Sequence, residues 1–193
     1  MGRWTTGARQ RLQAAALELF AERGYAATTV AAVAARAGLT ERTFFRHFPD
    51  KREVLFADDQ ALVEGLLAAV RDAPDPTDAW DAARRALAAM ARELEPRREE
   101  LRRRARVIAA DPDLVERDVV KHDRVVTALA RAMQEHGADP ARAALAAAVA
   151  GAVFRVAYQD WLAAPGEDPA AGGLAAHLER TADDLGRSLS PPR

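Results

Sequence analysis

Apolar residues recur at helical spacing along the chain, and the pattern is clearest in residues 28–51. Between residues 30 and 37 they fall three and four positions apart, which predicts a short helix with one buried side. Gly38 follows, at the place where a residue in the left-handed conformation commonly ends a helix. Phe44 and Phe48 then share one side of a second short helical stretch. The pattern predicts a helix-turn-helix unit, although an ordinary helical hairpin has the same spacing.

Hydroxyl side chains stand where both short helices begin. Thr29 precedes the first and Thr40 the second, and a hydroxyl at such a position accepts a hydrogen bond from the free N–H groups of a helix N-terminus. The outer side of the second helix carries mostly polar residues, namely Glu41, Arg42, Thr43, Phe45, Arg46 and His47. Such a face is what a helix-turn-helix needs to enter the major groove of DNA.

The rest of the chain continues in helical patterns, with no strand-like alternation of useful length. Gly and Asp-Pro pairs mark the ends and starts of these stretches. We therefore predict an all-α fold of about nine helices. Besides the two short helices, the predicted stretches are residues 5–23, 51–71, 78–95, 97–110, 112–136, 140–163 and 174–189.

Composition excludes several classes of protein. The chain has no Cys, which excludes disulfides, thiolate catalysis and Cys-based zinc sites. The sequence contains no glycine-rich phosphate loop, nucleophile elbow or His-Glu-x-x-His pair, so we expect no enzyme, metal site or cofactor. The longest apolar run, residues 143–154, is shorter than a membrane span, and the N-terminus has no signal-peptide core. We expect a soluble cytoplasmic protein that does not bind a membrane.

Charge is distributed unevenly along the chain. The net charge is −1, yet the first 52 residues hold nine Lys and Arg and only four acidic residues, which gives this segment +5. A basic head on an acidic body indicates that a polyanion such as DNA binds the head.

Residues 9–55 resemble the DNA-binding domain of the tetracycline-repressor (TetR) family. The matching stretches are LELFAERGYAATTV and VAARAGLTERTFFRHFPDK, followed by Leu55. The resemblance implies that residues 1–49 bind DNA and that residues 50–193 bind a ligand and dimerise. It also implies that residues 40–48 form the recognition helix. The implied DNA contacts are Thr29, Thr40, Glu41, Arg42, Thr43, Phe45, Arg46, His47 and Lys51. Among these, the resemblance places Glu41, Arg42 and Thr43 nearest base edges and gives phosphates to Thr29, His47 and Lys51.

Two positions depart from the family's pattern. Phe45 stands where the family commonly has Tyr, so a hydroxyl contact to phosphate is replaced by stacking or sugar packing. Ala31 lies where some members use Arg to reach a base. We therefore expect Arg42 to discriminate between sequences, because Arg binds guanine O6 and N7 through two hydrogen bonds.

The stretch 140–163 is apolar on two sides. Leu145, Val149, Ala152 and Val156 form one stripe, and Phe154, Tyr158 and Trp161 form another. One side can face the chain's own core, and the other then needs a cover. A homodimer through the last two helices, the family's usual arrangement, supplies it, and the Ala residues and Gly151 permit close helix approach. Alternatively, the helices at 97–110 and 112–136 cover both sides.

Two polar residues on apolar faces suggest a ligand pocket. His122 interrupts an apolar stripe and Arg155 is flanked by apolar residues. A lone His on an apolar face is more often a satisfied core residue, and an ion pair with a nearby Asp is the simpler explanation for Arg155. The candidate ligand contacts are Trp80, Met90, Arg106, His122, Val126, Phe154, Arg155 and Tyr158.

Six Arg residues lie within residues 97–106, and such a run is usually a solvated face. It is alternatively a mouth for phosphates. The FFRHF helix and this Arg-rich middle look like actinobacterial regulators of acyl thioesters, which implies an effector similar to acyl-CoA. We expect a homodimeric repressor that releases a pseudo-palindromic operator when it binds a small, largely apolar molecule. The alternative is an all-α ligand-binding or scaffold protein without DNA activity.

Overall fold

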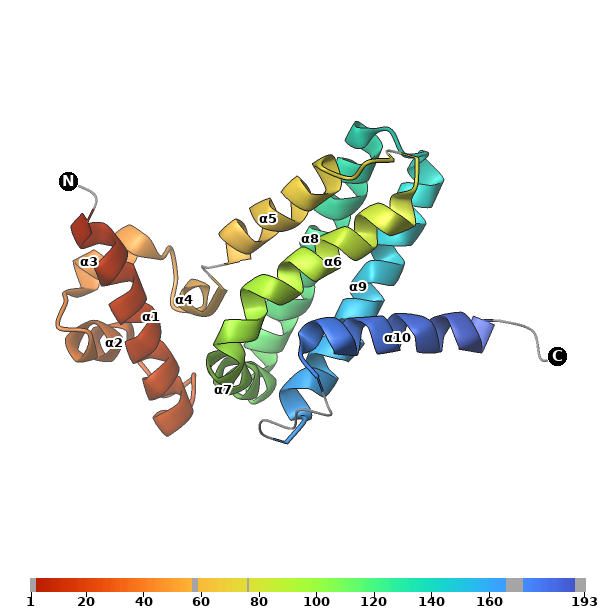
Figure 1. Ribbon diagram of the computed structural model, residues 1–193. Coiled ribbons are helices and arrows are strands. Elements are labelled where there is room, and N and C mark those ends of the chain that lie inside the picture. Colours follow the sequence, from red (N-terminus) through yellow and green to blue (C-terminus); the bar gives the residue numbers. More distant parts are fainter. Residues whose placement is uncertain (1–2, 57–58, 76, 166–171, 190–193) are drawn as a thin grey trace. The chain divides into compact units, whose positions relative to one another are not determined.

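The computed structural model describes residues 3–56, 59–75, 77–165 and 172–189. Within these ranges it contains helices and no strand, which confirms the all-α prediction (Figure 1). The elements are α1 (Arg3–Arg23), α2 (Val30–Arg36), α3 (Glu41–His47), α4 (Glu53–Phe56), α5 (Asp59–Arg71), α6 (Ala79–Leu94), the 3-10 helix η1 (Glu95–Arg97), α7 (Arg98–Ala109), α8 (Pro112–His136), α9 (Pro140–Ala163) and α10 (Leu174–Leu189).

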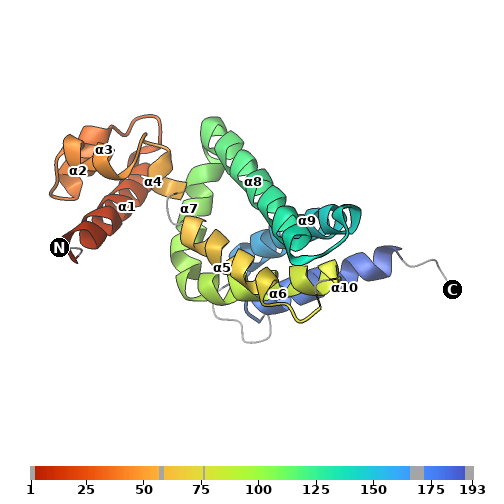
Figure 2. The same cartoon turned by 90° about the horizontal axis from the view of Figure 1, so that it is seen from above.

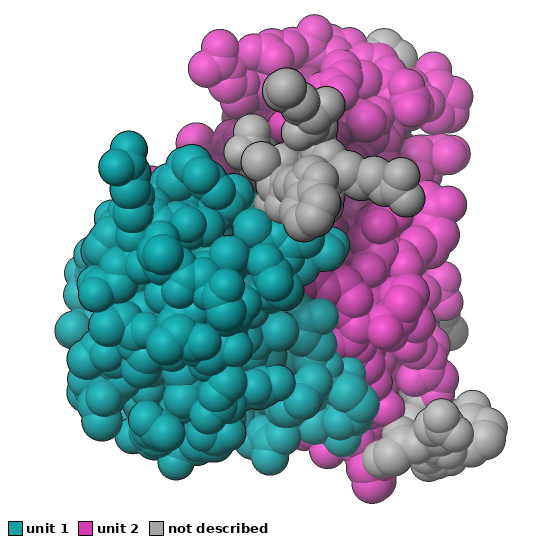
Figure 3. Space-filling model, turned by 90° about the vertical axis from the view of Figure 1, so that its left-hand side faces the viewer, with its two compact units in different colours: residues 1–60, 99–119 teal, residues 61–98, 120–193 magenta. Residues whose placement is uncertain are grey.

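The chain forms two compact units, coloured separately in Figure 3. The first lies within residues 1–60 and 99–119, and the second within residues 61–98 and 120–193. The first unit thus combines the N-terminal helices with most of α7 and the start of α8. These units are defined by packing. The boundary between residues 49 and 50 separates the part expected to bind DNA from the part expected to bind a ligand and dimerise, and it stays a prediction.

The core of the first unit is built on the helix-turn-helix. Helix α1 packs across α2 and α3, which lie side by side (Figures 1 and 2). Phe44 and Phe48 are buried in this core, as predicted, and each such side chain contributes roughly 1.5–3 kcal/mol of stability. The same cluster contains three residues from the corner between α7 and α8, namely Val107, Ile108 and Leu114. Residues far along the chain therefore complete the core beneath α3.

Local turn chemistry sets the helix ends that the sequence predicts. Gly24, Gly38 and Gly137 have φ values of 82°, 65° and 122°, which L side chains rarely adopt, and they follow α1, α2 and α8. The hydroxyl of Thr29 accepts a hydrogen bond from the Ala32 amide at 3.1 Å, and caps α2. Asp78, Asp111 and Asp139 accept similar bonds at the starts of α6, α8 and α9.

The helix predicted at 51–71 differs from the observed structure. Helix α4 runs only from Glu53 to Phe56 and α5 begins at Asp59, while residues 57–58 lie outside the described ranges. Asp50 caps α4 through the Glu53 amide at 2.9 Å, so Lys51 and Arg52 form the turn before the helix instead of its first turn. The loops predicted at 73–76 and 164–173 and the tail at 190–193 fall partly or wholly outside the described residues.

In the second unit, α9 packs against α6 and α10, and α10 also contacts α6 (Figure 1). Gly151 of α9 is buried against α8 of the same chain. A Cβ atom there would lie 2.5 Å from Val126 Cγ2 and 3.2 Å from His122 Nε2. The close approach that Gly151 permits is therefore made within the chain, which corrects the expectation that it serves the approach of a second copy.

Among the described residues, α9 is the one helix long and apolar enough, by length and composition, to cross a membrane. The continuous apolar run at 143–154 is shorter than a membrane span, whereas the whole helix is long enough. The core helix of a globular unit passes the same test, and α9 packs against α6 and α10 in this way.

Candidate nucleic-acid interface

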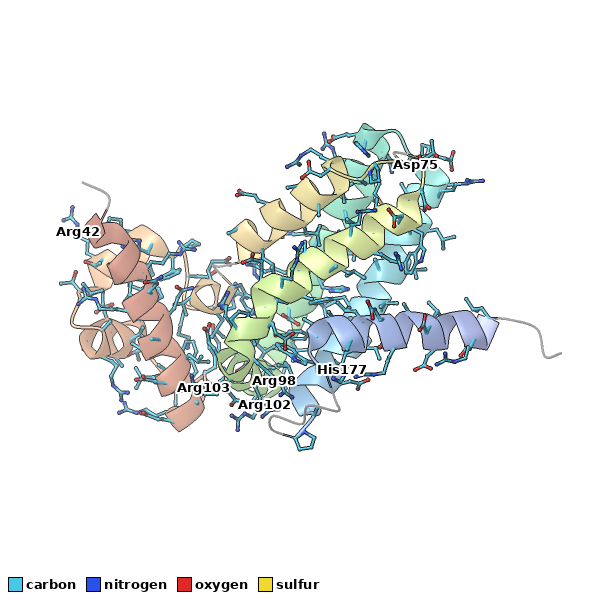
Figure 4. All side chains as sticks on the ribbon, in the orientation of Figure 1. Arg42, Asp75, Arg98, Arg102, Arg103 and His177 are labelled. Carbon is cyan, nitrogen blue, oxygen red and sulfur yellow. The ribbon has the colours of Figure 1, made fainter. Side chains whose placement is uncertain are left out.

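Helix α3 is fixed by its buried side and its cap, which leaves its outer side open. Phe44 and Phe48 pack their rings 5.3 Å apart beneath the helix. The Thr40 hydroxyl accepts a hydrogen bond from the Thr43 amide at 3.2 Å, which holds the first turn. Glu41, Arg42 and Arg46 are exposed, and Figure 4 shows Arg42 projecting away from the helices of its unit. The structure therefore exposes these three predicted DNA contacts on the outer side of one helix.

Thr29, the predicted phosphate contact at the start of α2, is exposed. Its oxygen accepts the cap hydrogen bond from Ala32, so its hydroxyl proton is available to an anion. A phosphate placed there would also face the N-terminal end of α2, whose dipole favours negative charge.

Phe45 is 54% exposed, with its ring edge-on to Phe44 at 5.5 Å. A ring exposed to this degree on a recognition helix offers apolar surface to a sugar or to the methyl group of thymine. It carries no hydroxyl, so it adds no hydrogen bond to a phosphate.

His47 is the predicted phosphate contact on α3, and its side chain is half-buried. Its Nε2 atom is buried and has no hydrogen-bond partner among the described residues. Burial, and to a smaller extent the nearby charges of Arg46 and Arg9, hold the pKa of His47 below its ordinary value of 6.5. The neutral ring can donate one N–H to a phosphate without bringing a full charge.

Lys51, the predicted phosphate contact from the turn before α4, already has partners within the protein. Its Nζ atom donates hydrogen bonds to the carbonyl oxygens of Tyr25 at 2.8 Å and Thr28 at 2.9 Å. The same atom lies 4.0 Å from the centre of the Tyr25 ring. The side chain is half-buried, in contrast to the exposed Arg42 and Arg46.

Long-range ion pairs that no local pattern predicts support this surface. Arg36 of α2 bonds two carboxylates of α1, Glu18 at 3.2 Å and Glu22 at 3.0 Å. Glu53 of α4 accepts a 2.7 Å bond from Arg117 of α8 in a half-buried pair. Each pair spans many residues along the chain.

The predicted ligand contacts divide into several groups. His122 and Val126 meet at Gly151, and Phe154 stacks on Tyr158 with ring centres 5.3 Å apart. Trp80 lines a groove of about 650 Å³ and Met90 a smaller one of about 260 Å³. Arg155 is exposed on α9, and Arg106 is exposed in the first unit. The structure thus joins two pairs of these residues.

The Arg-rich stretch before and in α7 is partly occupied by contacts within the protein. Arg98 donates to the carbonyl oxygen of Trp161 at 2.7 Å and to that of Ala164 at 2.8 Å, which closes the C-terminal end of α9. Arg102 pairs with Glu99 at 3.1 Å, and Arg104 lies over the Phe56 ring at 5.1 Å. Arg103 is exposed (Figure 4). Among the described residues, no three His, Asp or Glu side chains gather to hold a metal ion.

Comparison with known proteins matches both parts of the chain. Residues 12–57 match the family model for bacterial regulatory proteins of the tetR family, and residues 77–190 match the model of the MftR C-terminal domain. Over 82 residues the chain is 42% identical to the HTH-type transcriptional regulator TcmR of Streptomyces glaucescens. That alignment covers 41% of this chain and 36% of TcmR, so the chain spans little more than a third of this relative.

Solved structures share the fold over nearly the whole chain. NalD, the secondary repressor of the MexAB-OprM multidrug efflux pump in Pseudomonas aeruginosa, superposes with a TM-score of 0.61 at 17% identity, covering 93% of this chain and 95% of NalD. The fatty acid degradation regulator FadR from Bacillus halodurans gives a TM-score of 0.59 at 16% identity, covering 91% and 96%. At such identities the likeness shows the fold.

Proposed function

Because the chain belongs to the tetR family of bacterial regulatory proteins, we propose that it is a homodimeric repressor that leaves its operator when a small, largely apolar molecule binds. The family consists of DNA-binding transcriptional regulators and not of enzymes. In our proposal, residues 1–49 read the operator, while residues 50–193 dimerise and hold the effector. The protein then works in the cytoplasm, where it meets its DNA.

The observation that carries the DNA-reading part is the exposed, capped surface of α3. Arg42 and Arg46 leave this helix on its outer side, while Phe44 and Phe48 anchor the inner side. Arg42 is our proposed reader of a guanine, and Thr29 and His47 are proposed phosphate contacts. The remaining proposed contacts are Thr40, Glu41, Thr43, Phe45 and Arg46.

The dimeric part is supported by the uncovered side of α9. Leu145 is 67% exposed and Val156 is 48% exposed on the same stripe, with Val149 half-buried between them. A second copy packed along α9 and α10 would bury it and set two recognition helices on a two-fold axis, matched to a pseudo-palindromic operator.

The effector part is supported by apolar side chains in the second unit. The Phe154–Tyr158 stack and the His122–Val126 pair offer aromatic and aliphatic contacts. We propose an acyl-CoA-like effector as the finer assignment. Effector binding would favour a head spacing that no longer fits both half-sites.

Fluorescence anisotropy with duplex DNA from upstream of the protein's own gene tests this function. We expect the operator to bind at least about 10³-fold more tightly than a scrambled duplex at physiological salt. A long-chain acyl-CoA should release it, and free CoA should not. Equal affinity for both duplexes would contradict the regulatory proposal. Release by the free fatty acid alone would contradict only the acyl-thioester assignment.

A further inference from the structure

We propose that Lys51 is a positioning residue: its ammonium group fastens the connection between α1 and α2, so that it supports DNA binding from inside the protein instead of by holding a phosphate. This inference rests on the DNA-binding activity proposed above. It departs from the role that the sequence resemblance implies for the same side chain.

The geometry gives Lys51 two partners that are distant in sequence. Nζ donates to the carbonyl oxygens of Tyr25 at 2.8 Å and Thr28 at 2.9 Å. Thr28 lies directly before Thr29, the N-cap of α2, and its carbonyl is outside the helix ladder. A buried carbonyl without a partner destabilises the fold, so the lysine supplies a bond that this segment needs.

The surroundings of the segment show that it is tightly held. Thr28 is buried, and its hydroxyl donates to the Gly24 carbonyl at 2.8 Å. The Tyr25 ring packs edge-on against Phe20 at 5.2 Å on one side, and the Lys51 ammonium lies 4.0 Å from the centre of the same ring. Lys51 therefore joins the turn before α4 to two residues of the connection between α1 and α2.

The charge of Lys51 is also used within the unit. An ammonium group has three N–H donors, and two of them are committed to carbonyls while an aromatic ring covers part of the group. The carboxylate of Asp111, at the corner between α7 and α8, lies close enough to favour the charged form, against the effect of burial, which lowers the pKa of Lys51. Gripping a phosphate would require Lys51 to give up at least part of this arrangement.

Lys51 positions Thr29 by holding the adjacent Thr28. The Thr29 hydroxyl caps α2 and offers its proton to an anion, and its place depends on the segment that Lys51 holds. Removing Lys51 should loosen residues 25–29 and weaken the phosphate contacts made near the start of α2, on every DNA sequence alike.

Salt dependence of DNA binding separates the two roles. A residue that neutralises one phosphate contributes about 0.9 to the slope of log affinity against log salt concentration, whereas a residue that acts inside the protein contributes little. Lys51→Met keeps the aliphatic stem against Tyr25 and removes the donors. We expect it to lower operator affinity roughly tenfold with the slope unchanged. Amide hydrogen exchange of residues 25–33 in the free protein should become faster.

Two further variants complete the experiment. Arg52→Ala removes the same charge from the same turn, but Arg52 is exposed and pairs only loosely with Asp50 at 3.7 Å, so it controls for net charge. Lys51→Arg keeps a group that binds phosphate at least as well as Lys, but its planar fork does not fit the two carbonyls in the same way. We expect Lys51→Arg to lose affinity as Lys51→Met does, and it remains informative if Lys51→Met does not fold.

The outcomes separate this inference from the function on which it rests. A slope reduced by about 0.9 in Lys51→Met, with full affinity in Lys51→Arg, would overturn the positioning role and restore the phosphate contact. A wild-type protein that binds no operator would overturn the proposed function. In that case the hydrogen exchange of residues 25–33 still decides whether Lys51 holds the segment: unchanged exchange in Lys51→Met would overturn this role as well.

Discussion

Arg42 has its side chain in solvent on the outer side of a helix that is anchored from beneath. If it bonds a guanine, Arg42→Ala should cost about 1–3 kcal/mol on the operator and much less on random DNA, because only the operator offers the matched base. Anisotropy titrations of both duplexes at one salt concentration measure this difference. Equal losses on the two duplexes would show that Arg42 contacts phosphate instead.

His47 predicts how the stability of the free protein depends on pH. Its pKa is lowered in the folded state, so the unfolded chain binds more protons around the ordinary value of 6.5. The stability gained by burying the neutral ring is therefore present above pH 6.5 and is lost as the pH falls below it. Urea denaturation at pH 7.5 and pH 5.5 should show a smaller difference for His47→Gln than for the wild type. An identical pH dependence in both would contradict this role.

At the scale of elements, α8 and α9 approach closely because Gly151 of α9 has no side chain. In Gly151→Ala the new Cβ atom would lie 2.5 Å from Val126 Cγ2, so the Val126 side chain or the helices must shift, and overpacking of this kind typically costs about 1–3 kcal/mol. Gly65→Ala is the matched control, because Gly65 is also helical and has open space around it. We expect Gly65→Ala to stabilise the protein by up to about 1 kcal/mol.

Urea unfolding of both variants measures their free energies of unfolding, which we expect to fall in Gly151→Ala and to rise in Gly65→Ala. Adding Val126→Ala to Gly151→Ala should restore part of the lost stability, because it removes the methyl group that the new Cβ meets. A Gly151→Ala variant as stable as Gly65→Ala would show that α8 and α9 do not approach each other closely.

Element boundaries that depend on neighbouring residues could be predicted from the sequence, and contacts between distant elements could not. The caps at Thr29 and Thr40 and the glycine at 38 act within four residues, so the pattern alone identified α2 and α3. Arg98, in contrast, closes the end of α9 through Trp161, and Glu95 caps α10 through the Leu174 amide at 2.7 Å. These partners lie 63 and 79 residues away, and no local periodicity encodes them.

The candidate site shows the same limit. Its side chains lie on one short helix and its cap, so their common surface follows from helical geometry. The partners of Lys51 lie 26 and 23 residues away, and only the fold shows that its donors are already used. The sequence predicts one solvated, charged face for the Arg-rich stretch. In the fold, however, Arg98 bonds the Trp161 carbonyl and Arg104 lies over the Phe56 ring.

At the scale of the whole molecule, dimerisation makes a prediction about one exposed side chain. Val156→Glu would place a charge in the apolar stripe of α9, where a second copy is proposed to pack, so the protein should become monomeric. Val119 of α8 is exposed to the same degree, 49% against 48% for Val156, and lies outside the stripe. Val119→Glu should leave the oligomeric state unchanged. Analytical ultracentrifugation measures both, and a dimeric Val156→Glu would place the interface elsewhere.

Native mass spectrometry of the purified protein, mixed with duplex DNA from upstream of its own gene, brings the DNA-reading and dimeric parts into a single observation. We expect two chains on one duplex, with the complex lost when the effector is bound, and two chains are the number that a two-fold operator requires. A monomer that binds no DNA even at low salt would contradict a dimeric DNA-binding regulator and favour an all-α ligand-binding protein.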